Sequence, residues 1–244
     1  MKLKVIGTGS KGNAYLLENE EEALLIECGV NISEIKKAVD FNISKIVGCV
    51  VTHEHNDHAK SIKEVIGCSI SVYATKGTFE AKKIAFISKA RVVETVNEFT
   101  IGNFKILPFK INHDAAEPVG FLINHNDCGK VLFLTDTFYS NYTFKNLNNI
   151  IIEANYSKEI IKEKLADKEF LKDRIFKSHM SLETCLEFLE ANDLSKVNNI
   201  VLIHLSDGNS NEIQFKDAVE KQTGKKVFVA SNGMEIENFN KTPF

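Results

Sequence analysis

The sequence predicts a single α/β domain that spans residues 1–244. Apolar stretches of strand length alternate along the chain with amphipathic stretches of helical period. Several strand-like stretches end at a histidine, aspartate or glutamate, which is how the strands of an open α/β sheet deliver side chains to one site. The composition agrees, since 43% of the residues are apolar, 26% are charged and only three are prolines.

Composition also excludes some classes of protein. No apolar run approaches the ~20 residues of a membrane span, and no signal-type segment opens the chain. We therefore expect a cytoplasmic protein without a membrane partner; the oligomeric state stays open. A net charge of -3 argues against nucleic-acid binding through bulk charge but leaves a local basic groove possible. The five cysteines form no Cys-x-x-Cys pair, so reduced thiols are expected rather than disulfides or a zinc-thiolate site.

The first half of the chain is expected to alternate strands and helices. Strands are predicted at residues 2–6, 14–17, 23–27, 46–51 and 69–74, and helices at 32–39, 59–66 and 79–87. Asn31 and Glu34 form a capping-box pattern at the first helix. The loop of residues 7–13 reads best as a hairpin turn, although its glycines and polar side chains leave Ser10 and Asn13 as candidate substrate contacts.

The densest chemical signal is the segment Thr52–His58, which reads Thr-His-Glu-His-Asn-Asp-His. It holds three of the chain's seven histidines and an aspartate, directly after an apolar stretch. Imidazole and carboxylate groups are the usual ligands of zinc and similar ions. In an extended or turning backbone His53 and His55 project to one side, while Asp57 and His58 reach a second point nearby. The segment therefore predicts a metal site and can supply ligands to two ions. The alternative, a polar turn with incidental histidines, fits poorly with three of the seven histidines lying within six residues.

Four apolar stretches in the second half each lead to a residue that can handle metals or protons. They cover residues 104–111, 131–134, 150–152 and 199–203, and they lead to His113, Asp136, Glu153 and His204. Helices are expected at residues 157–165, 181–191 and 211–222, a hairpin turn at 102–103 and a late strand at 227–230. His125, within Asn-His-Asn-Asp, is expected in a surface turn.

The pattern His53-x-His55-x-Asp57-His58, followed by a lone His113, Asp136 and His204 at strand ends, resembles the metallo-β-lactamase-fold hydrolases. The likeness covers the whole chain, and within that superfamily the flanking sequences are closer to the YycJ (WalJ) group than to tRNase Z. Those flanking sequences are Gly9-Ser10-x-Gly12-Asn13, residues 112–121, Leu134-Thr135-Asp136-Thr137 and His204-Leu205-Ser206-Asp207-x-Asn209. The fold implied is an αββα four-layer sandwich of two mixed sheets with helices on both outer faces.

The resemblance also implies a dinuclear site for two divalent ions, Zn²⁺ or Mn²⁺, that share a hydroxide nucleophile. One ion would be held by His53, His55 and His113, the other by Asp57, His58 and His204, with Asp136 bridging the two. Asp57 counts among the catalytic residues as well.

Departures from the family pattern narrow the choice among its members. Asp136 stands where the best-known zinc lactamases have a cysteine, which points away from antibiotic hydrolysis. Glu27 stands where the family usually has an aspartate.

Glu153 and His179 resemble a proton-donating pair of tRNase Z in their order and context. His179 would then protonate a leaving oxygen, and Glu153 would fix the tautomer of its ring. The alternative is a solvated strand end next to an ordinary helix cap. Ser206 and Asn209 are further candidate substrate contacts, although a turn explains them almost as well.

Three functions follow as hypotheses. The first is a dinuclear phosphodiesterase or nuclease, with DNA favoured over RNA and a 5′-to-3′ DNA exonuclease implied by the YycJ resemblance. The second is a thioester or lactone hydrolase of the glyoxalase II type, which would use the same ligands. The third is a non-catalytic binding module that metals stabilise, against which all seven filled ligand positions argue.

Overall fold

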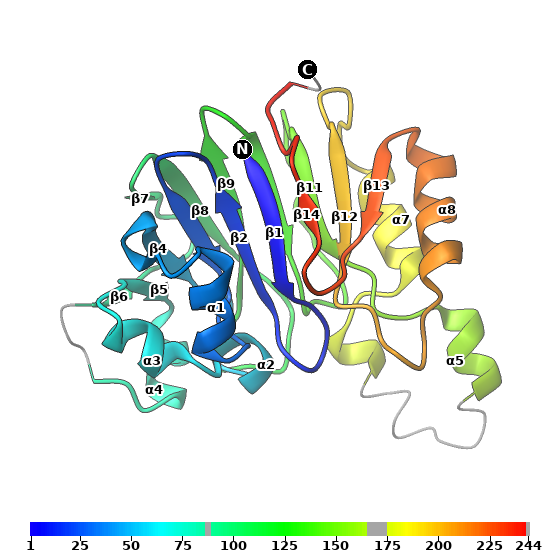
Figure 1. Ribbon diagram of the computed structural model, residues 1–244. Coiled ribbons are helices and arrows are strands. Elements are labelled where there is room, and N and C mark those ends of the chain that lie inside the picture. The colour runs from blue at the N-terminus through cyan, green and yellow to red at the C-terminus, as the bar shows by residue number, and fades with distance from the viewer. Residues whose placement is uncertain (86–88, 165–174, 243–244) are drawn as a thin grey trace.

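The chain forms two β-sheets that pack face to face, with helices on both outer faces (Figure 1). This arrangement is seen in a computed structural model that describes residues 1–85, 89–164 and 175–242. The predicted αββα sandwich of two mixed sheets is confirmed.

The first sheet takes most of its strands from the N-terminal part of the chain. In spatial order it contains β14 (Glu235–Ile236), β1 (Lys2–Gly7), β2 (Ala14–Glu18), β3 (Ala23–Ile26), β4 (Ile46–Val50), β5 (Val72–Ala74) and β6 (Ala90–Val92). The pairs from β14 to β3 are antiparallel, and those from β3 to β6 are parallel. The short strand β14 was not predicted.

The second sheet repeats this mixture. Its order is β13 (Lys226–Val229), β12 (Asn199–Ile203), β11 (Asn149–Glu153), β10 (Gly129–Leu134), β9 (Val119–His125), β8 (Phe104–Lys110) and β7 (Phe99–Ile101). The strands from β13 to β10 are parallel, and those from β10 to β7 form antiparallel hairpins, including the predicted turn at residues 102–103.

The central parallel strands β3, β11 and β12 are buried on both faces, which explains their nearly unbroken apolar sequences. On β10, Val131 and Phe133 point into the core between the sheets, whereas Leu132 and Leu134 lie in the outer core. That outer core is covered by α7 (Leu182–Glu190) and α8 (Glu212–Thr223). The first sheet has a matching outer core with α1 (Ile32–Ala38), α3 (Ile62–Gly67) and α4 (Lys76–Ala81).

Most helices differ from the predictions only at their ends, but the helix expected at residues 79–87 overlaps α4 at residues 79–81 alone, and residues 82–85 are not helical. The helix expected at residues 59–66 is two shorter helices, α2 (Asn56–Ala59) and α3, because the Ser61 amide donates to the Cys28 carbonyl instead of continuing a helical ladder. Asn31 caps α1 without the side-chain bond that a capping box requires. α5 is Lys158–Lys164, and residues 86–87 and 165 of the predicted helices lie outside the described residues.

Nine described non-glycine residues have a positive φ, and three of them are residues that the sequence analysis singled out and that follow a strand. Glu27 directly follows β3 with φ 66°, Asp136 follows β10 with φ 48°, and His204 directly follows β12 with φ 56°. Non-glycine residues adopt such angles only when the surrounding structure compensates for the strain, and they cluster at functional sites.

Two further observations complete the fold. Within the described ranges, no helix has the length and apolarity needed to cross a bilayer. All five cysteines are free thiols, and four of them are buried.

Candidate metal centre

The segment Thr52–His58 leaves the end of β4 and is fixed by its neighbours before it reaches α2. The Thr52 amide donates to both carboxylate oxygens of Glu27, at 3.3 Å each, and the Val119 amide donates to the Thr52 carbonyl. At the other end the His58 carbonyl accepts the Cys28 amide. Both ends are thus bonded to the turn that follows β3, so the segment is held over the edge of the first sheet.

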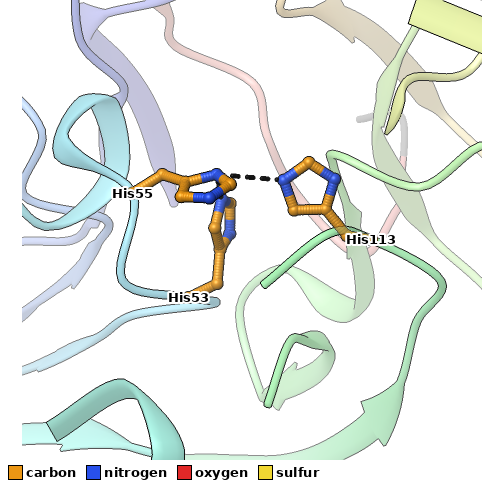
Figure 2. Close-up of side chains that lie close together, drawn as sticks. All are labelled: His53, His55 and His113. Atoms are coloured by element: carbon orange, nitrogen blue, oxygen red, sulfur yellow. Dashed lines mark hydrogen bonds between the residues drawn. The ribbon is translucent and has the colours of Figure 1, made fainter. Parts of the chain in front are cut away.

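The first cluster consists of His53, His55 and His113 (Figure 2). Nδ1 of His55 lies 3.1 Å from Nε2 of His53 and 3.1 Å from Nε2 of His113. The other nitrogen of His113, Nδ1, donates to the Ser178 carbonyl at 3.0 Å, so its Nε2 is left with a lone pair. Three imidazole nitrogens therefore converge on one point from two segments far apart in sequence.

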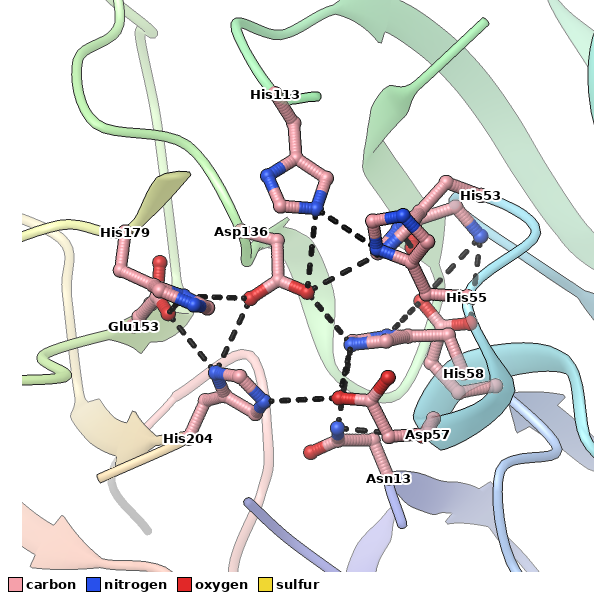
Figure 3. A network of polar contacts seen from close by, with 12 residues as sticks. Asn13, His53, His55, Asp57, His58, His113, Asp136, Glu153, His179 and His204 are labelled. Carbon is pink, nitrogen blue, oxygen red and sulfur yellow. Dashed lines mark hydrogen bonds and ion pairs between the residues drawn. The ribbon is translucent and has the colours of Figure 1, made fainter. Parts of the chain in front are cut away.

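The second cluster contains Asp57, His58, Asp136 and His204 (Figure 3). Oδ2 of Asp57 lies 3.4 Å from Nε2 of His58 and 3.3 Å from Nε2 of His204, and Oδ2 of Asp136 lies 2.7 Å from Nε2 of His58. The same Asp136 oxygen is 3.4 Å from Nε2 of His53 in the first cluster. Asp136 therefore stands between the clusters, and all seven side chains form one connected group.

The ligand atoms have the spacing that a tetrahedral ion requires. Ligands held 2.0–2.1 Å from zinc lie roughly 3.3 Å from one another, and most of the separations above lie between 3.1 and 3.4 Å. Three nitrogens that face each other this closely cannot all be protonated. The clusters are thus suited to binding divalent metals.

Outer partners orient several of these ligands. Nδ1 of His204 donates to Oε1 of Glu153 at 2.9 Å, which leaves Nε2 facing the second cluster. Nδ1 of His58 lies 3.5 Å from Oε1 of Glu27, a fully buried glutamate whose carboxylate also accepts the Thr52 amide. Nδ2 of Asn155 donates to the His204 carbonyl at 2.7 Å.

A buried hydroxyl links the β1–β2 loop to the second cluster. Tyr15 Oη lies 3.0 Å from Thr8 Oγ1 and 3.1 Å from Asn13 Oδ1. Thr8 Oγ1 accepts the amide of His204, and Nδ2 of Asn13 donates to the Asp57 carbonyl. Sequence patterns gave no sign of Thr8, Tyr15 or Asn155, because a strand tyrosine and isolated polar residues look the same wherever they occur.

Glu153 and His179 form the pair that the sequence suggested, and they lie beside the second cluster. Oε1 of Glu153 accepts from Nδ1 of His179 at 2.8 Å, and Oδ1 of Asp136 lies 3.2 Å from the same nitrogen (Figure 3). Burial disfavours the protonated ring, but the Glu153 and Asp136 carboxylates outweigh it and raise the pKa of His179 to about 10.

In the first cluster, burial together with the neighbouring imidazoles holds the pKa of His53 well below its usual value.

The clusters open into a cavity of about 500 Å³. His179 lies in its wall, together with three of the predicted substrate contacts, Ser10, Ser206 and Asn209. The fourth, Asn13, is only 1% exposed, and its amide is bonded within the loop and to the Asp57 carbonyl.

The expectation for His125 was wrong. His125 is the last residue of β9, where it pairs with Gly129 of β10. It is buried, and its Nε2 lies 3.2 Å from Oε1 of Glu22.

Comparison with known families and proteins agrees with this geometry. The model of the metallo-beta-lactamase superfamily matches residues 7–197. The exodeoxyribonuclease YycJ of Bacillus anthracis is 29% identical over 174 residues, which are 66% of each chain. The exodeoxyribonuclease WalJ of Streptococcus pneumoniae is 27% identical over 225 residues, which cover 86% of this chain and 83% of that protein.

Solved structures show the same fold at low identity. YhfI of Bacillus subtilis, a metallo-beta-lactamase fold protein, superimposes with a TM-score of 0.72 at 17% identity, over 97% of this chain and 99% of that one. The short form of human tRNase Z gives a TM-score of 0.64 at 18% identity, over 98% and 99% of the two chains.

Proposed function

Because the chain belongs to the metallo-beta-lactamase superfamily, we propose that it is a dinuclear metal-dependent phosphodiesterase that cleaves nucleic acid. In its most specific form the proposal is a 5′-to-3′ exonuclease on DNA, the substrate class in the names of the two YycJ and WalJ relatives. His53, His55 and His113 would hold one ion, Asp57, His58 and His204 the other, and Asp136 would bridge them.

The position of His179 is the observation that favours one reaction over the others. Its Nδ1 is engaged by Glu153 and Asp136, so Nε2 is the ring nitrogen left for a substrate in the cavity. A phosphodiester releases an alkoxide, which needs a proton, whereas a thioester releases a thiolate, which does not. A general acid beside the metal ligands thus favours the phosphodiesterase over the thioester hydrolase.

Each group then has a defined task. Two divalent ions, when bound, would lower the pKa of water to generate the nucleophile and would neutralise charge on the phosphate oxygens. Glu153 holds both His179 and His204 through one carboxylate oxygen, so the proton donor and a ligand of the second ion keep a fixed relation. His179 gives the proton on Nε2 to the leaving oxygen. Ser10, Ser206 and Asn209 supply polar groups for the remaining phosphate oxygens.

The test compares two leaving groups. His179→Ala should lose roughly 10²- to 10⁴-fold in kcat on an oligonucleotide and much less on bis(p-nitrophenyl) phosphate, whose leaving group departs as a stable anion. Equal losses on both substrates would refute proton donation by His179.

A substrate panel tests the rest of the proposal. End-labelled single- and double-stranded DNA and RNA, each with Zn²⁺ or Mn²⁺, should show stepwise shortening of DNA from its 5′ end. Hydrolysis of thioesters or lactones without any cleavage of nucleic acid would replace the nuclease with the esterase. An Asp136→Ala variant that keeps full activity would exclude catalysis by this site.

A further inference from the structure

Exposed aromatic side chains gather on the two segments that flank His113. Among the described residues, eight large hydrophobic side chains are exposed, and four of them are aromatic residues in these segments: Phe138, Tyr139, Tyr142 and Phe176. Phe138, Tyr139 and Phe176 are 42%, 48% and 39% exposed. The rings do not line the cavity themselves, but Asp136, Ile175 and Ser178, which are close to them in sequence, do. Exposed apolar groups on segments that adjoin a cavity are a mark of an interaction surface.

Hydrogen bonds fix Tyr139 beside the first cluster. Its carbonyl accepts from Thr137 Oγ1 at 2.8 Å and from Nδ2 of Asn112 at 3.2 Å, and the Asn112 amide donates to Thr137 Oγ1. Asn112 immediately precedes the ligand His113. The backbone of Tyr139 is therefore anchored next to His113, while the residue as a whole is 48% exposed.

Phe176 is anchored from the other side of the same ligand. The carbonyl of Ser178, two residues further on, accepts the Nδ1 hydrogen of His113, and Ser178 lines the cavity. The ring of Phe176 rests against Tyr156, with 5.5 Å between ring centroids. Tyr139 and Phe176 are thus each joined to His113 through one or two hydrogen-bonded residues, and both rings keep an exposed part.

Cationic groups accompany the rings. Lys177 follows Phe176, and Lys110 ends β8 two residues before Asn112; both are exposed, and neither forms an ion pair with any described residue. Unpaired ammonium groups on the segments around His113, close in sequence to the exposed rings or to the residues that anchor them, suit a polymer that alternates phosphates with flat bases. A net charge of -3 gives the rest of the surface no general attraction for nucleic acid.

We propose that Tyr139 and Phe176, with Phe138 beside them, form a stacking platform for unpaired bases next to the scissile phosphate. This inference rests on the proposed nuclease function and adds a substrate requirement, an unpaired strand end at the site. Bases inside a duplex are stacked on each other and cannot lie on the rings, so single strands or frayed ends are bound in preference to paired ones.

The test measures binding and cleavage separately. Tyr139→Ala and Phe176→Ala should each weaken the binding of a single-stranded oligonucleotide by roughly 5- to 150-fold, the range expected for one lost base stack. Binding is followed by fluorescence anisotropy, and 2-aminopurine near the 5′ end reports stacking directly. Tyr139→Phe, which keeps the ring, should restore both signals, and Phe41→Ala, at an exposed aromatic residue in the turn after α1, should match the wild type.

Two comparisons separate this inference from the proposed function. The loss of kcat/KM should be at least tenfold larger on the single strand than on bis(p-nitrophenyl) phosphate, which has no base to stack, and larger than on blunt duplex DNA. Unchanged single-strand affinity in both alanine variants overturns the platform and leaves the patch to a protein partner. If the wild type cleaves no phosphodiester, the nuclease proposal fails. The anisotropy measurements would still show whether Tyr139 and Phe176 bind unpaired bases.

Discussion

Replacing Glu27 with glutamine should selectively weaken binding of the ion that we propose for the second cluster. The Glu27 carboxylate accepts the Thr52 amide with both oxygens and lies 3.5 Å from Nδ1 of His58. A glutamine keeps one oxygen, so it can satisfy Thr52 or His58 but not both. Its NH₂ group would then face either the Thr52 amide or the His58 Nδ1 hydrogen, and two donors would oppose each other.

The size of the effect follows from what is lost. At 3.5 Å the contact between Glu27 and His58 is a long ion pair, and Nδ1 of His58 has no hydrogen-bond partner among the described residues. The about 1.5–3 kcal/mol of a buried hydrogen bond to a charged acceptor is therefore the upper limit of the loss. At 1.4 kcal/mol for each factor of ten, the affinity of the second ion should fall by up to roughly 100-fold. The first ion should keep nearly its full affinity, because His53, His55 and His113 make no contact with the Glu27 carboxylate.

Competition with a chromophoric chelator measures both affinities. Glu22→Gln is the matched control, since Glu22 is also a buried carboxylate but binds Asn103 and His125 at the far end of the sheets. It should lower the stability of the fold without changing metal affinity. If the Glu27→Gln variant binds both ions with the affinities of the wild type, Glu27 does not orient His58.

Three further changes have defined outcomes. Burial opposes ionisation of Glu18, but hydrogen bonds from Lys4 and Lys45 outweigh it and lower its pKa; its contribution to stability is therefore present above the ordinary glutamate pKa and lost as the pH falls through the lowered one. Glu18→Gln should accordingly destabilise the protein at neutral pH, and urea titrations should show the difference shrinking in acid. Phe133→Ala, in the core between the sheets, should cost about 3–5 kcal/mol of unfolding free energy in the same assay. Tyr15→Phe should reduce the affinity of the second ion by about tenfold, measured with the chelator, because the loop that holds Asp57 and His204 loses its central hydroxyl.

The sequence revealed those parts of the site that follow local rules. Thr52–His58 is contiguous, and its ligand types are diagnostic by themselves. His113, Asp136 and His204 were identifiable because each follows an apolar strand, and strand ends meet at one edge of a sheet. The sandwich itself came from resemblance, since periodicity predicts elements but not how two sheets face each other.

What the sequence did not reveal depends on contacts between distant segments. The break between α2 and α3 is caused by a bond from Ser61 to Cys28, which no helix propensity encodes. β14 is only two residues long and exists because β1 offers it a partner. His125 looked like a turn residue because its neighbours are polar, yet Glu22 from the other sheet meets it and buries it.

The left-handed backbone at Glu27, Asp136 and His204 sets a condition for transplanting this centre. A residue in this conformation, one or two positions after a strand ends, breaks the pleat, so its side chain no longer follows the alternation of the strand. Copying the seven candidate ligands onto another scaffold would therefore also require a left-handed backbone at the positions of Asp136 and His204. Selection of scaffolds should begin with backbone angles at the rim and only then consider side-chain identity.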